Sequence, residues 1–213
     1  MGIKVAKFGG SSLASADQFR KVKEILLMDA DRCIVVPSAP GKRSSTDIKV
    51  TDLFYECNRL AAAGKDIGEA FERIRERYHG IAQELGLRVN LDAYLDEVCK
   101  CIQLGAGADY AASRGEYLNG ILLADYMGWD FVDPQTGIFF DKEGRLDSEK
   151  TQEKLGKLLQ QTTDKTVRDA NMEKVNEEIK AYYIEKYGEE AYALAKADIA
   201  EVVYRLEKKT VRS

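Results

Sequence analysis

Hydrophobic and polar positions alternate along the first 160 residues in two rhythms, one typical of short strands and one of helices. Two short apolar runs, at 4–8 and 33–37, predict strands, and the continuous second run is typical of a buried parallel strand. Between them, apolar residues recur every three or four positions over 15–28, which predicts a helix. The stripe of this helix consists of Phe19, Val22, Ile25 and Leu26.

The same periodicity predicts further elements downstream. Helices are expected at 51–63, 66–85, 91–104, 113–127 and 148–159, and strands at 129–133 and 137–141. Gly64, Gly105 and Gly107 follow predicted helices and are expected to end them. Strands that alternate with helices indicate βαβ units, so we expect an α/β fold with a mainly parallel sheet covered by helices.

The last quarter of the chain has a different composition. Sixteen of the 17 glycines lie at or before Gly156, and no proline follows Pro134. We therefore divide the chain into 1–160 and 161–213, and we predict a helical hairpin over 170–208 with Gly188 as a cap between its helices. The apolar stripes of the hairpin are Met172, Val175, Ile179, Tyr182, Tyr183 and Tyr187, then Tyr192, Ala195, Ile199, Val202, Val203 and Leu206.

Charge and composition exclude several classes of function. The net charge of −4 argues against nucleic acid as the main partner. No segment approaches the ~18 to 20 apolar residues that a membrane helix needs. Four cysteines in a chain of this length are expected to be reduced thiols, so we expect a cytoplasmic protein. With His79 as the only histidine, a zinc site built on a pair of histidines is excluded, and we predict no metal site.

The sequence Lys7-Phe8-Gly9-Gly10-Ser11-Ser12 is the strongest chemical signal, because it stands where a strand ends and a helix is about to begin. Two glycines let backbone N–H groups approach an anion, and a helix N-terminus favours negative charge. The alternative is a tight turn with a serine as helix N-cap. Lys7, with its full positive charge, favours the anion site.

Two weaker signals follow. The loop Ser38-Ala39-Pro40-Gly41-Lys42 comes after the second strand, before a helix that opens near Thr51. Ligands of parallel α/β sheets bind beyond the carboxyl ends of strands, where this loop and the glycine turn would both lie. Ser113 to Tyr117 reads SRGEY. Taken alone, Thr51 is explained as an N-cap, and Ser113 with Glu116 as a capping box.

Taken together, KFGGSS, SAPGK followed by VTDL, and ASRGEYL resemble the motifs of aspartate kinases, in the amino acid kinase superfamily. The resemblance covers about residues 1–160. It implies an αβα sandwich whose N-terminal half holds the amino acid and whose C-terminal half holds the nucleotide. It also implies ATP and Mg²⁺, with L-aspartate as the acceptor.

The resemblance also implies residue roles. Lys7 would be the catalytic lysine that neutralises the transferring phosphoryl group, with Gly9, Gly10 and Ser11 as the phosphate cradle. The residues expected to bind aspartate are Ser12, Ser38, Thr51, Arg114 and Glu116. Glu116 would face the α-ammonium group of aspartate.

Aspartate kinases continue beyond this region with a VIPGF-like strand, a second glycine turn of the GRGGSD type and a WTDVDG-like nucleotide segment, none of which occurs here. The alternative function is therefore a catalytically inactive half-kinase that binds ligand or assembles as a homodimer or with a partner chain. A third possibility is an interaction protein whose hairpin is the working part. We expect the hairpin to cover the incomplete sheet or to form a dimer interface, so that deleting 165–213 causes insolubility.

Overall fold

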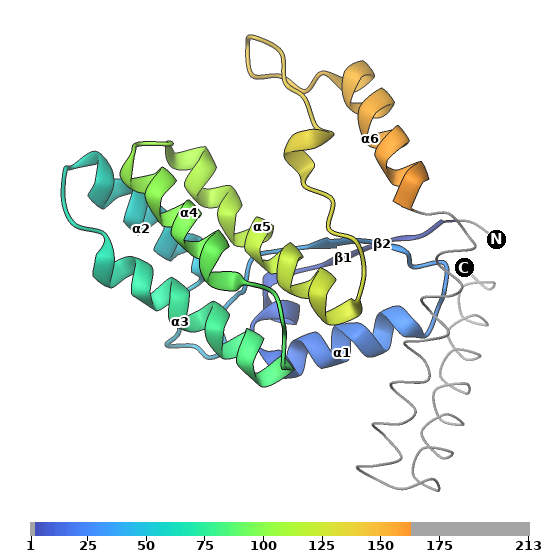
Figure 1. Ribbon diagram of the computed structural model, residues 1–213, viewed down its shortest axis with the longest axis horizontal. Helices are drawn as coiled ribbons and strands as arrows, with labels where there is room; N and C mark the ends of the chain where they lie inside the picture. The colour runs from blue at the N-terminus through green and yellow to red at the C-terminus, as the bar shows by residue number, and fades with distance from the viewer. Residues whose placement is uncertain (1–2, 163–213) are drawn as a thin grey trace, which may run out of the picture.

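The computed structural model describes residues 3–162 as a mixed α/β structure (Figure 1). Its elements are β1 (Val5–Phe8), the 3₁₀ helix η1 (Gly10–Leu13), α1 (Ala16–Leu27), β2 (Ile34–Pro37), α2 (Val50–Ala62), α3 (Gly68–Leu85), α4 (Leu91–Gln103), α5 (Ala108–Met127), the 3₁₀ helix η2 (Pro134–Thr136) and α6 (Ser148–Thr162). The two predicted N-terminal strands and the helices predicted before residue 160 are present, most of them within one or two residues of their expected ends.

The β1–α1–β2 segment forms a parallel unit. Val5 pairs with Ile34 and Phe8 with Pro37, while α1 makes the crossover. This arrangement confirms the prediction of a βαβ unit with parallel strands. In Figure 1, α1 lies below the strand pair, α5 runs across it, and α2, α3 and α4 group beside α5.

The core lies where the helices meet. α2 packs against α3, α4 and α5, and α5 also packs against β2. The predicted stripes supply this core, although Ile25 of α1 is 42% exposed and does not take part. Side chains that are fully buried include Phe19, Leu26, Phe54, Ile74, Tyr78, Leu95, Leu118 and Leu122.

The strands expected at 129–133 and 137–141 are wrong. The first segment is irregular and leads into η2, and Phe140 of the second makes only an isolated antiparallel bridge with Leu146. The ring of Phe131 packs against that of Tyr117, with centroids 5.5 Å apart, so this apolar side chain packs on α5 and not within a sheet. Pro134 then opens η2 and has no N–H with which to extend a ladder.

Within residues 3–162 the sheet consists of two strands, and it is incompletely covered. Val5 is 63% exposed and Val36 is 47% exposed, although a parallel sheet is normally buried on both faces. The hairpin predicted at 170–208, the cap at Gly188 and their proposed covering role lie outside the described residues. None of the helices between residues 3 and 162 has the length and apolar character needed to cross a lipid bilayer.

The contact of α5 with α2 and β2 makes Leu122 a sensitive position. Leu122→Ala removes a fully buried side chain, and we expect it to lower the free energy of unfolding by about 2–5 kcal/mol in a urea titration. Leu104→Ala is the matched control, because Leu104 is 77% exposed and its truncation should cost less than about 0.5 kcal/mol. Equal losses in the two variants would contradict this placement of the core.

Candidate functional site

The glycine turn after β1 and the loop after β2 meet at one end of the strand pair. Ser38 N–H donates to the carbonyl of Phe8 at 2.9 Å, which continues the pairing beyond the strands. Gly41 N–H then donates to the carbonyl of Gly10 at 2.8 Å. Because parallel strands end at the same edge, the sequence order alone predicts this meeting, and the structure confirms it.

The approach of Gly10 to Gly41 leaves no room for a side chain on either residue. A Cβ atom on Gly41 would lie 2.6 Å from the carbonyl carbon of Gly10. A Cβ atom on Gly10 would lie 2.9 Å from the carbonyl oxygen of Ala39. Gly9 differs, since no atom lies within 4 Å of its Cβ position and the residue is exposed. Gly10 therefore packs against the loop, while Gly9 faces open space.

The third motif reaches the same place from α5. A Cβ atom on Gly115 would lie 2.6 Å from the Cβ atom of Ala39, so the helix and the loop are in direct contact. One turn later, Asn119 donates from Nδ2 to the carbonyl of Ser38 at 2.6 Å. Asn119 is fully buried, and its Oδ1 atom has no hydrogen-bond partner among the described residues. Asn119 lies just outside the SRGEY motif and belongs to no motif recognised in the sequence.

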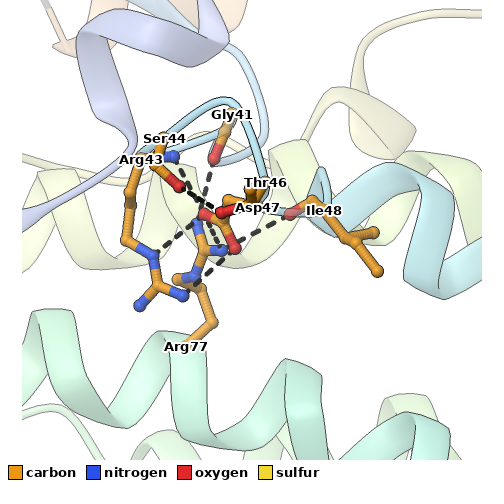
Figure 2. A network of polar contacts seen from close by, with 7 residues as sticks. All are labelled: Gly41, Arg43, Ser44, Thr46, Asp47, Ile48 and Arg77. Carbon is orange, nitrogen blue, oxygen red and sulfur yellow. Dashed lines mark hydrogen bonds and ion pairs between the residues drawn. The ribbon is translucent and has the colours of Figure 1, made fainter.

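Two adjacent residues of α3 also bind these motifs. Tyr78 donates its hydroxyl to the carbonyl of Gly115 at 2.8 Å. Arg77 donates from Nη1 to the carbonyl of Gly41 at 3.0 Å, and its Nη2 lies 2.5 Å from Asp47 (Figure 2). Arg43 holds the same carboxylate through its backbone N–H and its Nε, at 2.8 and 2.9 Å.

Burial and charge shift the ionisation of this cluster. Hydrogen bonds from the Arg43 side chain, with help from Arg77, hold the pKa of Asp47 well below its ordinary value of 3.8. Burial lowers the pKa of Arg77, and the nearby charge of Arg43 adds to this effect. Burial raises the pKa of Tyr78 well above its ordinary value, and the charge of Glu116 contributes in the same direction. Tyr78 is therefore a neutral donor.

Several expected ligand-binding residues lie around the glycine turn. Lys7 is on β1 with an exposed side chain, and no described carboxylate pairs with its ammonium group. Ser11 is exposed, while Ser12 and Ser38 are half-buried. The N-cap alternatives for this region are wrong. The N-cap position of η1 is Gly9, that of α1 is Ser15 and that of α2 is Lys49, and none of the three makes a side-chain capping hydrogen bond. Thr51 is half-buried in the first turn of α2.

Arg114 and Glu116 lie within α5, which begins at Ala108 after Gly107, five residues earlier than predicted. The capping-box explanation of Ser113 and Glu116 is therefore wrong. Arg114 is 7% exposed, and its guanidinium lies between two tyrosine rings, 4.5 Å from the centroid of Tyr110 and 4.6 Å from that of Tyr117. It donates to Ser113 Oγ at 3.0 Å. Glu116 is exposed.

A cleft of about 640 Å³ opens beside β2 and α5. Arg114 and Glu116 line it, together with β2 and the side chains of Phe131 and Leu155. None of the candidates at the glycine turn lines this cleft. The expected site residues thus form two groups, one around Gly9 and Gly10 and one along α5, and Ala39 and Gly41 join the two by direct packing. No sequence motif predicts this cleft.

Within the described part of the chain, no three His, Cys, Asp or Glu side chains gather closely enough to hold a metal ion. The four cysteines lie in this part and form no disulfide. His79 is partly exposed and contacts Asp92 at 2.9 Å.

Comparison with known proteins gives one consistent relationship. No protein-family model matches the chain. Aspartokinase 3 of Bacillus subtilis is 36% identical over 153 residues, which cover 66% of this chain and 34% of that protein. The aspartokinase of Chlamydia trachomatis is 37% identical over 87 residues, which cover 41% of this chain and 18% of that protein.

Solved structures agree with these relatives. The crystal structure of Clostridium acetobutylicum aspartate kinase superposes with a TM-score of 0.71 at 49% identity, over 73% of this chain and 36% of that one. Aspartokinase III of E. coli, in complex with aspartate and ADP, gives 0.58 at 20% identity over 74% of this chain and 37% of that one, which supports the fold alone. A segment of this chain thus resembles aspartate kinases and shares their fold. The chain spans about a third of the length of the Bacillus relative and of these two structures.

The contact between the two loops predicts opposite effects for neighbouring glycines. Gly41→Ala forces a carbon atom to within 2.6 Å of backbone, and we expect it to lower the free energy of unfolding by about 1–3 kcal/mol. Gly9→Ala adds the same methyl group where the structure is open, and should change stability by less than about 0.5 kcal/mol. Urea unfolding measures both, and a neutral Gly41→Ala would contradict the close approach.

The depressed pKa of Asp47 predicts a pH-dependent stability. The ionised carboxylate favours the folded state, so its contribution is present above the ordinary pKa of 3.8 and is lost as pH falls below it. The stability difference between wild type and Asp47→Asn should be constant near neutral pH and shrink in acid. Asp96→Asn, which changes a carboxylate whose side chain is 69% exposed, is the control and should differ little from wild type. A difference for Asp47→Asn that grows in acid would contradict this assignment.

Proposed function

We propose that this chain provides the aspartate-binding and phosphate-neutralising part of an aspartate kinase, which transfers the γ-phosphoryl group of ATP to the side-chain carboxylate of L-aspartate. The observation that carries the proposal is the convergence of three separate motifs on Ala39 and Gly41. The 49% identity to the Clostridium acetobutylicum enzyme supports it. The cysteines, none of which forms a disulfide, agree with a cytoplasmic location.

The residues around the glycine turn suit a phosphoryl group. Lys7 brings an exposed ammonium group with no carboxylate partner among the described side chains. Gly9 leaves space in which an anion can approach the backbone, and Ser11 offers an exposed hydroxyl. Gly10 would not bind the phosphoryl group itself; its contact with Gly41 fixes the position of the turn.

The second group of residues suits an amino acid. Glu116 is exposed on α5 and would pair with the α-ammonium group of aspartate. Ser12, Ser38 and Thr51 are half-buried polar residues near the turn and would bind its carboxylates. Arg114 is held between two tyrosine rings, so we assign it to shaping the wall of the cleft beside Glu116.

These residue types match the chemistry of the reaction. The acceptor carboxylate is already ionised at neutral pH, so no general base has to remove a proton. Its oxygen forms a bond to the γ-phosphorus as the bond from that phosphorus to the bridging oxygen breaks, and ADP leaves. The task of the protein is to align two anions and to neutralise charge between them. Lys7 performs the second part of this task.

ATP and Mg²⁺ are implied by the resemblance to aspartate kinases. The glycine turn and Lys7 fit the phosphates of a nucleotide, for the reasons given above. Mg²⁺ bound to these phosphates supplies further charge neutralisation. The adenosine part requires residues beyond this motif.

The alternative is a binding or assembly module without turnover. One observation favours it: β1 and β2 leave Val5 and Val36 exposed. In addition, β1 and β2 each have one edge that is unpaired among the described strands, and further strands can pair with such an edge. In this case the chain binds L-aspartate but releases no product unless its partner is present.

An aspartyl-hydroxamate assay with ATP, Mg²⁺ and L-aspartate tests the kinase proposal. We expect Lys7→Ala to lower kcat by about 100-fold or more, because a charge aimed at the transition state is lost. Lys21→Ala removes an exposed lysine of α1 and should retain full activity.

The result separates the candidates. Turnover that survives in Lys7→Ala contradicts the role of Lys7. A wild-type chain that forms no hydroxamate, yet binds L-aspartate in calorimetry and loses that binding in Glu116→Gln, supports the binding module. A chain that neither turns over nor binds aspartate contradicts both.

A further inference from the structure

Arg77 is a charged residue in an unusual place. It lies on the buried side of α3 and is 6% exposed, although arginine is rarely buried without dedicated partners. Its partners are not on α3. Its three side-chain hydrogen bonds within the described part of the chain all go to the loop between β2 and α2, at Gly41, Asp47 and Ile48.

The guanidinium spans the loop from one end to the other. Nη1 binds the carbonyl of Gly41 at 3.0 Å, and Nη2 binds the carboxylate of Asp47 at 2.5 Å and the carbonyl of Ile48 at 3.4 Å. Figure 2 shows the carbonyl groups of Gly41 and Ile48 directed at the guanidinium of Arg77, above α3. The planar, forked geometry of arginine allows two positions to be fixed at once, which a lysine cannot reproduce.

Arg43 also binds the carboxylate of Asp47, but its structural role differs from that of Arg77. It belongs to the loop itself, is 57% exposed, and closes a short ring with Asp47 through its own backbone N–H. This ring shapes the loop without attaching it to anything. Within the network, Arg77 is the only side chain that comes from outside the loop, so it supplies the attachment to α3.

Gly41 is the residue that connects Arg77 to the glycine turn. Gly41 accepts from Arg77 through its carbonyl, and its own N–H donates to Gly10 at 2.8 Å. Between these two glycines there is no free space, since even one carbon atom would be 2.6 Å from backbone. A shift of Gly41 away from α3 therefore moves Gly10, and with it the exposed backbone of Gly9 and Ser11.

We propose that Arg77 is a positioning residue of the phosphate site: by holding Gly41 on α3, it fixes the direction in which the glycine turn presents its backbone donors. This proposal rests on the proposed function for the identity of the anion. Arg77 touches no substrate. Its effect belongs to the phosphoryl-transfer step, while the α5 residues that would bind aspartate remain in place through Tyr78.

The test uses the full chain with Arg77→Met, Arg77→Lys and the control Arg73→Met. Arg73 lies one turn earlier on α3, is 42% exposed and has only a loose 3.7 Å pair with Glu56, so its replacement removes the same charge without breaking a hydrogen bond to the loop. We expect Arg77→Met to lower kcat by 10- to 100-fold with less than a threefold change in KM for aspartate. Arg77→Lys should recover part of the loss, and Arg73→Met should match wild type.

A second readout does not need turnover. Amide hydrogen exchange, followed by NMR, reports the Gly41 N–H that donates to Gly10 and the Ser38 N–H that donates to Phe8. Arg77→Met should speed exchange at Gly41 by at least tenfold and leave Ser38 within threefold of wild type. Titration of inorganic phosphate should shift the Gly9 and Ser11 amides in wild type and shift them less in Arg77→Met.

The outcomes distinguish the two proposals. Wild-type exchange at Gly41 in Arg77→Met overturns the positioning role, whether or not the chain is active. Equal acceleration at both amides also overturns it, because the loss is then general unfolding. Faster exchange at Gly41 alone, in a chain that neither binds phosphate nor turns over, confirms that Arg77 holds the loop but refutes its role at a phosphate site and the proposed function with it.

Discussion

The backbone contact between Gly10 and Gly41 is the constraint on which the candidate site depends. It joins the end of β1 to the loop after β2 at a separation that no side chain could tolerate. Van der Waals repulsion makes this contact rigid, because backbone atoms cannot relieve a steric clash by changing a side-chain rotamer. Gly115 of α5 makes a similar close contact with Ala39, which also leaves no room for a side chain on the glycine. The three motifs therefore share one steric junction.

The helices around this junction have unequal roles. α5 contributes residues that face the cleft, whereas α3 contributes residues that hold other segments. Arg77 and Tyr78 are neighbours in sequence, and they bind the loop and α5 respectively. One turn of α3 thus fixes two of the three motifs relative to each other. The hydrogen bonds that do this are buried, and an unsatisfied partner would be costly there.

Much of the fold could be predicted because local periodicity and burial agree. The α3 stripe of Phe71, Ile74 and Tyr78 is buried as its spacing indicates. The segment at 129–133 could not be assigned correctly, because an apolar residue such as Phe131 packs equally well on a helix or in a sheet. Only the tertiary contact with Tyr117 decides between these possibilities.

The site was predicted in part for a similar reason. Short motifs with glycine next to charge identified the turn, the loop and α5, but the residues that hold them together have no motif. Arg77 stands within a run of charged residues, which favoured an exposed position. A weak signal was available, since Arg77 is three residues after Ile74 and four before Ile81, within the buried stripe. Asn119, between Leu118 and Gly120 on a helix buried on several sides, carried a comparable signal.

The partial cover of the strand pair has a mechanical consequence for the glycine turn. The turn is mounted on β1, whose alternate residues face outward and which pairs with β2 alone among the described strands. A strand with few packing contacts around it resists deformation only weakly. The contacts that hold the backbone of the glycine turn in place therefore come from the loop after β2 and from α3. A chain that gained more strands next to β2 would stiffen this turn without changing any residue in it.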